Sequence, residues 1–301
     1  MADTLEQFSK HHDFFVGIDS DGCVFDSMEI KHKECFCPAF INHYGLQPAA
    51  KYAREIWEFV NLYSHTRGCN RFKAVLAALA FADARKEIRD RNVEVPRLTA
   101  LAQWVAAENK LGNPQLEKKL AEGEDPDLRR VYEWSLDVNA AVAKIVRNVP
   151  PFPGVVESLE RLQGSADVVC VSQTPTEALL REWAEHNLTR YVELIAGQEL
   201  GTKAEHLAGT ARQSGTRYPA DHVLMIGDAP GDLKAAQSVG ALFYPVLPGR
   251  EEKSWERFTT EALDRFVSGS YAGEYEKELI DEFMQVLPER PSWETVRRPD
   301  R

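Results

Sequence analysis

The stretch FFVGIDSDGCVFD, residues 14–26, decides the fold. Residues 14–18 are almost all apolar, which is the pattern of a buried strand. Two aspartates, Asp19 and Asp21, follow at once, and Gly22 then allows the chain to turn out of the sheet. We expect Asp19 at the strand tip, with Asp21 folded back over the same site. Two converging carboxylates suit a nucleophile beside a general acid/base, although a strand that ends in a polar turn has the same composition.

A repeating pattern of strands and helices fills the second half of the chain. Short apolar runs predict strands at residues 167–172, 191–196, 222–227 and 241–246. Helices are predicted before, between and after them, at residues 155–162, 176–186, 203–214, 233–239, 254–267 and 275–286. Alternation at this spacing is typical of a parallel sheet with helices on both faces. We therefore predict an α/β fold with a Rossmann-like parallel sheet that includes residues 14–18.

The segment between residues 27 and 149 is different, because we find no convincing strand in it. Helical patterns occur instead at residues 29–44, 49–63, 71–81, 98–108, 114–121 and 127–146. The proline-rich sequence VPPFPG, residues 149–154, ends this region. We therefore predict a discontinuous α/β core, residues 1–27 and 150–301, that is interrupted by an all-helical domain, residues 28–149.

The composition of the chain argues against several classes of partner. A net charge of −11 over 301 residues argues against generic binding to nucleic acids or to anionic membranes. The negative charge does not exclude a small anionic substrate, because a few local cations and a metal ion can reverse the local electrostatic field. Five cysteines are an odd and low number for a disulfide framework. The first 13 residues are polar and do not resemble a signal peptide, so a cytoplasmic location is expected, while the oligomeric state is not predicted.

Three further sites follow predicted strands. Ser172 ends one strand, where its hydroxyl would donate to an oxyanion, although serine is common before turns. Lys203 opens a predicted helix, where the helix dipole prefers anions, although a solvated surface lysine is the simpler interpretation. Asp228 follows the next strand, and Asp232 lies at a helix start, where any carboxylate is stabilised. Asp19 and Asp228 together offer hard oxygen ligands that suit Mg²⁺.

The order of these four motifs resembles that of the haloacid dehalogenase (HAD) superfamily. The resemblance consists of DSDG at residues 19–22, Ser172 at a strand end, Lys203, and GDAPGD at residues 227–232. It implies a Rossmann-like sheet with the active site at the carboxyl ends of the strands. The helical insertion after the first motif resembles the C1-type helical cap of the β-phosphoglucomutase-like and phosphatase branches.

The resemblance also implies catalytic roles for four residues. Asp19 would attack phosphorus and form an aspartyl phosphate. Asp21 would protonate the leaving oxygen and then deprotonate water. Ser172 and Lys203 would bind the phosphoryl oxygens. The implied function is that of a Mg²⁺-dependent phosphohydrolase acting on a small phosphorylated metabolite.

The metal ligands implied by the resemblance come from the first and last motifs. Mg²⁺ would be held by the Asp19 carboxylate, the Asp21 backbone carbonyl and Asp228. Asp232 would assist the metal or fix Lys203.

Three other functions stay open at this point. They are a β-phosphoglucomutase-like phosphomutase, a phosphonate C–P hydrolase, and a non-catalytic binding protein on the same fold. The C–P hydrolase would need a lysine in the helical domain to form a Schiff base, and the candidates are Lys31, Lys33 and Lys73.

The stretch YSHTRGCNRFK, residues 63–73, is the best candidate for substrate recognition in the helical domain. It places polar and cationic side chains around one glycine between two predicted helices: His65, Arg67, Asn70 and Arg71. Arginine binds phosphate or carboxylate groups in a bidentate manner. A solvated loop between two helices would have the same composition.

Overall fold

Two units make up the computed structural model, which describes residues 2–213 and 217–295. Among these residues, the first unit contains 2–28 and 148–287, and the second contains 29–147 and 288–295. The predicted domain division stays a prediction. The second unit, unlike the predicted helical domain, also includes residues 288–295.

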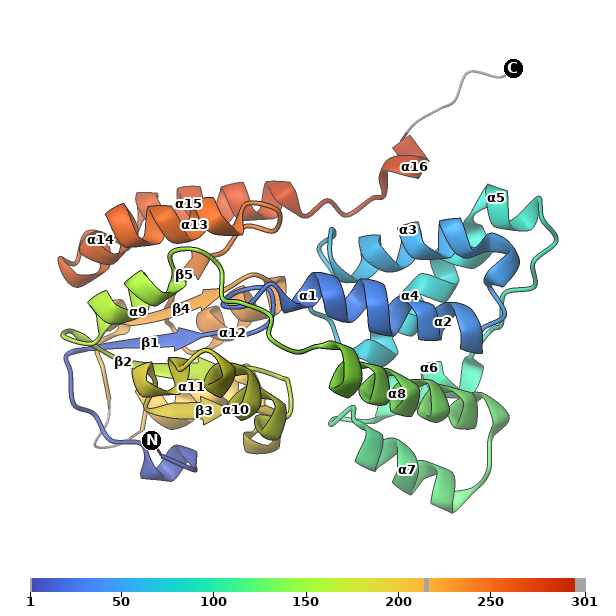
Figure 1. Ribbon diagram of the computed structural model, residues 1–301, viewed down its shortest axis with the longest axis horizontal. Coiled ribbons are helices and arrows are strands. Elements are labelled where there is room, and N and C mark those ends of the chain that lie inside the picture. The colour runs from blue at the N-terminus through green and yellow to red at the C-terminus, as the bar shows by residue number, and fades with distance from the viewer. Residues whose placement is uncertain (1, 214–216, 296–301) are drawn as a thin grey trace. The chain divides into compact units, whose positions relative to one another are not determined.

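A five-stranded parallel sheet forms the centre of the first unit (Figure 1). Its strands are β1 (Phe14–Ile18), β2 (Ala166–Val171), β3 (Leu194–Ala196), β4 (Val223–Gly227) and β5 (Leu242–Pro245). The spatial order is β3-β2-β1-β4-β5, and every pairing is parallel. The predicted α/β fold with a Rossmann-like sheet is confirmed.

The register brings the carboxyl ends of the central strands to one level. Ile18, the last residue of β1, lies opposite Cys170 of β2 and Ile226 of β4. The chain moves outward from β1 to β2 and β3, and then returns to the other side of β1 for β4 and β5. Ligands of open α/β sheets bind in the crevice at such a reversal of strand order. Asp19, the residue after β1, lies at this point.

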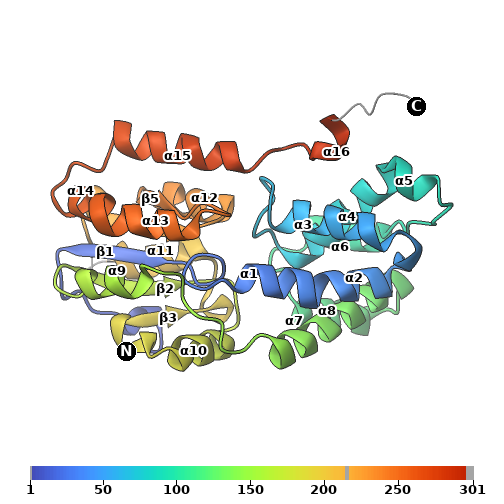
Figure 2. The same ribbon diagram turned by 45° about the horizontal axis from the view of Figure 1, so that its top comes forward.

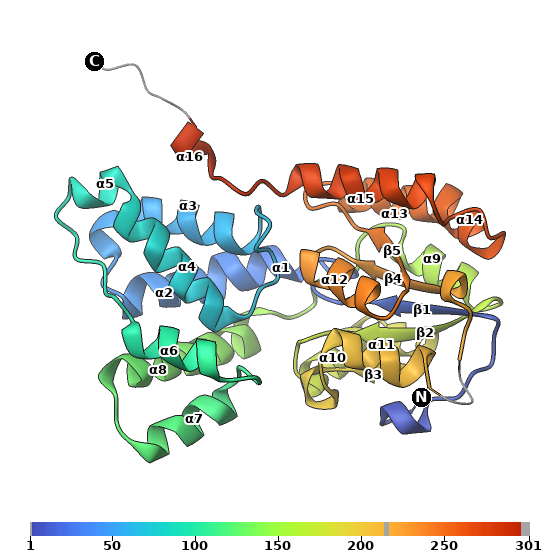
Figure 3. The same cartoon turned by 180° about the vertical axis from the view of Figure 1, so that it is seen from behind.

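Alternate residues of β1 face two separate apolar cores. Val16 and Ile18 belong to one cluster, and Phe15 belongs to the other. The first cluster is covered by α9 (Val155–Leu162), α10 (Thr176–Glu185), α13 (Glu251–Arg257) and α14 (Leu263–Val267). The second is covered by α11 (Lys203–Ala211) and α12 (Pro230–Ser238), which lie in front of the sheet in Figure 3. Helix α15 (Glu274–Val286) packs beside β5 and contributes to both clusters.

The second unit has no strand in residues 29–147, as predicted. Its helices are α2 (Cys37–His43), α3 (Ala50–Asn61), α4 (Arg71–Ala84), α5 (Lys86–Arg89), α6 (Thr99–Ala107), α7 (Asn113–Glu122) and α8 (Pro126–Ile145). A π-helical segment, Lys31–Phe36, joins α2 to α1 (Ser27–Ile30), and α3 lies beside α4 (Figure 2). The buried rings of Trp57 and Trp134 pack edge to face in its core. Within residues 2–213 and 217–295, we find no helix with the length and hydropathy that a membrane span needs.

Residues 289–295 contact the helices of the second unit through the Trp293 ring. Trp293, in the short helix α16 (Ser292–Thr295), contacts Phe59 and Phe81 in edge-to-face geometry. The Arg85 guanidinium lies 4.4 Å from the centre of the Trp293 ring. These aromatic and cation–π contacts hold the segment against the helices of its own unit.

Candidate active site

The turn after β1 holds Asp19 in a fixed position at the sheet edge. The Asp19 amide donates to the Ile226 carbonyl (3.0 Å), which extends the pairing with β4 by one residue. The Ser20 amide donates to Asp19 Oδ1 (2.7 Å). Gly22 has φ 74°, a conformation that favours glycine, and its amide donates to the Phe25 carbonyl (2.8 Å). Asp19 is therefore buried, and the backbone already orients one of its carboxylate oxygens.

The turn after β4 brings two more buried carboxylates to the same edge. Asp228 follows Gly227 directly, and Asp232 lies in the first turn of α12, which begins at Pro230. Asp232 Oδ2 accepts from the Ala229 amide (3.0 Å), a contact that suits a carboxylate at a helix N-terminus. A Cβ atom on Gly227 would lie 2.4 Å from the Asp232 Cβ, so only glycine permits this close approach.

Lys203 connects the two turns. It is the first residue of α11, and Thr202 caps that helix by accepting from the Glu205 amide. The Lys203 Nζ lies 2.6 Å from Asp19 Oδ2 and 2.5 Å from Asp232 Oδ1. The helix dipole disfavours a lysine at this position, and the two carboxylates offset that effect. The structure therefore brings together the first, third and fourth of the predicted motifs.

The carboxylates of Asp19, Asp228 and Asp232 share this site with the ammonium group of Lys203. Ligand oxygens of Asp19, Asp228 and Asp232 lie within 4.8 Å of one another, and all three residues are buried. Burial raises the pKa of Asp19 to about 7, against the opposing effect of Lys203, and burial also raises the pKa of Asp232. Burial alone would lower the pKa of Lys203, but its two carboxylate partners raise it above its ordinary value. An excess of buried negative charge on hard oxygen donors fits a divalent cation such as Mg²⁺.

Two hydroxyl groups hold the side chain of Asp21. The Ser27 hydroxyl donates to Asp21 Oδ1, and the Thr174 hydroxyl donates to Asp21 Oδ2 (2.8 Å). The Thr174 amide in turn donates to Ser172 Oγ (3.2 Å). Ser172 is buried just after β2, and its amide donates to the Ala196 carbonyl of β3 (3.0 Å). Neither Ser27 nor Thr174 is among the predicted site residues. A threonine in a turn after a strand, for example, has no distinctive sequence pattern.

Comparison with known families agrees with this arrangement. A family model described as haloacid dehalogenase-like hydrolase matches residues 16–240, which include all four motifs. The chain belongs to the haloacid dehalogenase-like hydrolase family. The resemblance seen in the sequence motifs is thereby confirmed, while the branch within the superfamily stays a prediction. A search of curated proteins found no match.

Solved structures of other haloacid dehalogenase-like proteins resemble this chain at low sequence identity. A predicted phosphoglycolate phosphatase from Haemophilus somnus is 14% identical, with 78% of this chain and 86% of that chain covered and a TM-score of 0.45. A haloacid dehalogenase-like protein from Streptococcus pneumoniae is 14% identical, with 82% and 91% covered and a TM-score of 0.44. A hydrolase of the same family from Xanthomonas campestris is 13% identical, with 90% and 100% covered and a TM-score of 0.44. Similarity at this level carries no information about the substrate.

The residues predicted to bind substrate in this haloacid dehalogenase-like hydrolase lie in the second unit, at the start of α4 and in the turn before it. Asn70 caps α4, because its Oδ1 accepts from the Phe72 amide (3.0 Å). Arg67 is buried, and its guanidinium donates to the Leu62 carbonyl (2.9 Å). Both side chains therefore have structural contacts inside the unit.

Arg71 and His65 differ in their surroundings. The Arg71 guanidinium donates to Ser135 Oγ (3.0 Å) and to Asn139 Oδ1 (2.7 Å), and it lies 5.0 Å from the centre of the Phe36 ring. Burial lowers the pKa of Arg71 to about 10. His65 is exposed. A role in substrate binding stays a prediction for all four residues.

Proposed function

We propose that the protein is a Mg²⁺-dependent phosphohydrolase that acts on small phosphorylated metabolites through an aspartyl phosphate on Asp19. The observation that carries this proposal is the contact of Lys203 Nζ with Asp19 and Asp232, beside the buried carboxylate of Asp228. A carboxylate and a phosphate group repel each other, so a carboxylate nucleophile needs a cation fixed next to it. Lys203 is such a cation.

Asp19 is the proposed nucleophile and Asp21 the proposed acid/base. Attack of the Asp19 carboxylate on phosphorus forms the acyl phosphate. Lys203 and the Ser172 hydroxyl bind phosphoryl oxygens, and Lys203 offsets the charge that accumulates beside Asp19. Asp21 gives a proton to the leaving oxygen, and it then accepts a proton from the water that hydrolyses the acyl phosphate.

The proposed ligands of Mg²⁺ are the carboxylates of Asp19 and Asp228 and the backbone carbonyl of Asp21. When bound, the ion neutralises phosphate charge and aligns the phosphoryl group for displacement. Both oxygens of Asp232 accept hydrogen bonds, one from Lys203 and one from a backbone amide. Of its two predicted roles, fixing Lys203 is therefore the one we assign to Asp232 first, with assistance to the metal second.

Removal of the metal will abolish activity. We expect phosphate release from p-nitrophenyl phosphate to require Mg²⁺ and to stop with EDTA. Asp228→Asn will lower the rate by about 100-fold, because it removes a buried metal-ligating carboxylate. The matched control is Asp221→Asn, an exposed aspartate just before β4, which will keep the wild-type rate.

Three results would contradict the proposed function. The first is phosphate release that persists in EDTA. The second is no release across a panel of sugar phosphates, nucleotides, phosphonates and phosphoglycolate-like acids. The third is isomerisation of a sugar phosphate with little phosphate release, which would favour the phosphomutase.

Loss of the Thr174 hydroxyl will reduce activity without unfolding the protein. Thr174→Val keeps the shape of the side chain but removes one of the two hydroxyl donors to Asp21. A less well oriented Asp21 is a weaker acid/base, so we expect kcat to fall about tenfold while the melting temperature changes little. The control is Thr260→Val, an exposed threonine whose hydroxyl bonds only to the carbonyl one helical turn before it. An unchanged kcat in Thr174→Val would show that this hydrogen bond does not position Asp21.

The helical insertion is the proposed cap domain, and we propose that His65, Arg67, Asn70 and Arg71 take part in choosing the substrate. Replacement of either arginine would also remove contacts inside the unit. His65 is the best position for a first test because its side chain is exposed. The cytoplasmic location stays a prediction.

A further inference from the structure

A second cluster of metal-ligating side chains lies at the opposite end of the strands from Asp19. His11 precedes β1, Asp167 is the second residue of β2, and Glu193 directly precedes β3. One ligand atom of each lies within 4.8 Å of the other two. Ser172 is five residue steps beyond Asp167 along β2, which amounts to roughly 16 Å along the sheet. The cluster is therefore separate from the candidate active site.

Hydrogen bonds hold the carboxylate of Asp167 in a fixed position. It is 1% exposed, and its Oδ2 accepts from the amides of His11 and His12, both at 2.9 Å, and from the Tyr218 hydroxyl at 2.5 Å. Burial by itself raises the pKa of Asp167, but these hydrogen bonds outweigh it and hold the pKa below its ordinary value. The other oxygen, Oδ1, faces the two imidazole rings.

The two histidines lie at different distances from Asp167 Oδ1. His12 Nδ1 is 2.9 Å away, which is a hydrogen bond. His11 Nδ1 is 3.6 Å away, which is too long for a hydrogen bond. Two ligands that each lie about 2.0 to 2.1 Å from one tetrahedral ion are roughly 3.4 Å apart. The spacing of His11 and Asp167 thus suits two ligands of a shared ion.

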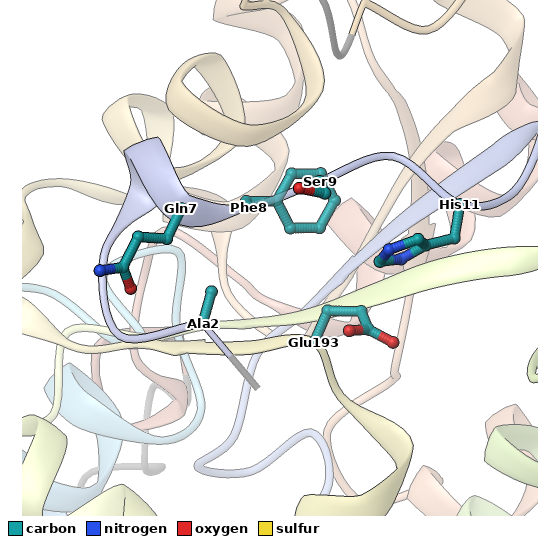
Figure 4. Close-up of a pocket in the computed structure, with 6 residues that line it drawn as sticks. All are labelled: Ala2, Gln7, Phe8, Ser9, His11 and Glu193. Atoms are coloured by element: carbon teal, nitrogen blue, oxygen red, sulfur yellow. The ribbon is translucent and has the colours of Figure 1, made fainter.

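An open pocket adjoins two members of this cluster, His11 and Glu193. Its volume is about 310 Å³, and its lining residues are Ala2, Gln7, Phe8, Ser9, His11 and Glu193. In Figure 4 the carboxylate of Glu193 and the ring of His11 lie near each other at one end of the pocket. Two of the three ligating side chains can therefore be reached from the pocket.

We propose that His11, Asp167 and Glu193 bind a divalent transition-metal ion of the zinc type. An imidazole with two carboxylates favours such an ion over Mg²⁺ or Ca²⁺, which prefer oxygen ligands. His12 orients the ligating oxygen of Asp167 through its hydrogen bond. Three protein ligands leave one tetrahedral position for water from the pocket. The ion ties the segment before β1 to the amino ends of β2 and β3.

Titration of the full chain with Zn²⁺ tests this proposal. The protein is first stripped of metal and then supplied with Mg²⁺, so that the candidate active site is occupied. Calorimetry will show one tightly bound Zn²⁺ that is not displaced by Mg²⁺, and Zn²⁺ will raise the melting temperature. His11→Ala and Glu193→Gln will each weaken Zn²⁺ binding about 10- to 100-fold and remove the gain in melting temperature. Neither side chain is buried, so both variants keep the fold.

Two controls separate this site from the rest of the protein. Glu157→Gln changes an exposed glutamate on α9 and will leave Zn²⁺ binding unchanged. Asp228→Asn alters the other carboxylate cluster and will also retain the bound Zn²⁺. The proposal is overturned if wild-type protein binds no Zn²⁺, if binding is lost in Asp228→Asn, or if His11→Ala and Glu193→Gln bind as well as wild type.

Discussion

Asp19→Asn will lower phosphate release from p-nitrophenyl phosphate by roughly 10⁴-fold or more. The amide has nearly the same size and still accepts the hydrogen bond from the Ser20 amide, but it lacks the anionic oxygen that attacks phosphorus. It also loses its ion pair with Lys203. The measurement is kcat and kcat/KM at saturating Mg²⁺, because loss of the nucleophile lowers both values together.

The control for Asp19→Asn must have the same chemical change elsewhere in the first unit. Asp221→Asn meets this condition. Asp221 is exposed and directly precedes the amino end of β4, whereas the candidate active site lies at the carboxyl end of that strand. Comparable melting temperatures for the two variants would show that the loss of activity is not a loss of folded protein. A folded Asp19→Asn variant with a wild-type rate would rule out Asp19 as the nucleophile.

Lys203→Met will destabilise the protein and nearly inactivate it. The substitution leaves the buried carboxylates of Asp19 and Asp232 without their shared cation. Removing one partner from a buried ion pair costs about 3 kcal/mol or more, so we expect the free energy of unfolding in EDTA to fall by about that amount. We expect kcat to fall by about 10²- to 10³-fold, because a fixed positive charge beside the phosphoryl group is lost. Urea denaturation and steady-state kinetics measure the two effects separately.

Two variants control for the change at position 203. Lys234→Met replaces an exposed lysine on α12 and will leave stability and activity unchanged. Lys203→Arg keeps the charge and will retain more stability than Lys203→Met. The planar guanidinium cannot take the position of a single Nζ between two carboxylates, so the activity of the Lys203→Arg variant will stay low. Wild-type stability and kcat in Lys203→Met would contradict the role assigned to this ion pair.

The strands and their order along the chain were predictable because buried parallel strands are short, continuous apolar runs. The run at residues 14–18 and the one that ends at Gly227 have this form, and both lie in the sheet within a residue of the predicted positions. The spatial order of the strands, in contrast, was not predicted. Periodicity alone does not specify which strands pair.

The sequence motifs predicted candidate site residues one by one, but not most of the contacts between them. Lys203 alone has the properties of a surface lysine, and its partner Asp19 lies 184 residues away. Contact with Lys203 was one of two roles that the family resemblance implied for Asp232, and in the folded chain the two side chains do meet. Thr174 was missed for a similar reason, because its partner Asp21 is distant in sequence and comes near only when β1 and β2 pair.

Two features outside the motifs were also not predictable from the sequence. His11 lies in a polar segment that has no regular periodicity, and its neighbours Asp167 and Glu193 come from strand ends far along the chain. Trp293 lies in a polar stretch near the chain end, yet its ring packs against Phe59. Both features depend on contacts that form only after the elements have assembled.

The central claim is that Asp19 carries the phosphoryl group during turnover, and trapping that intermediate tests it most directly. Protein mixed with Mg²⁺ and a rapidly hydrolysed phosphomonoester is quenched and reduced with borohydride, which converts an aspartyl phosphate to homoserine. Peptide mass spectrometry then identifies the aspartate positions at which homoserine has formed. We expect homoserine at position 19 in the wild-type protein, and none there in Asp19→Asn or without substrate. Sustained phosphate release with position 19 unmodified would contradict the claim.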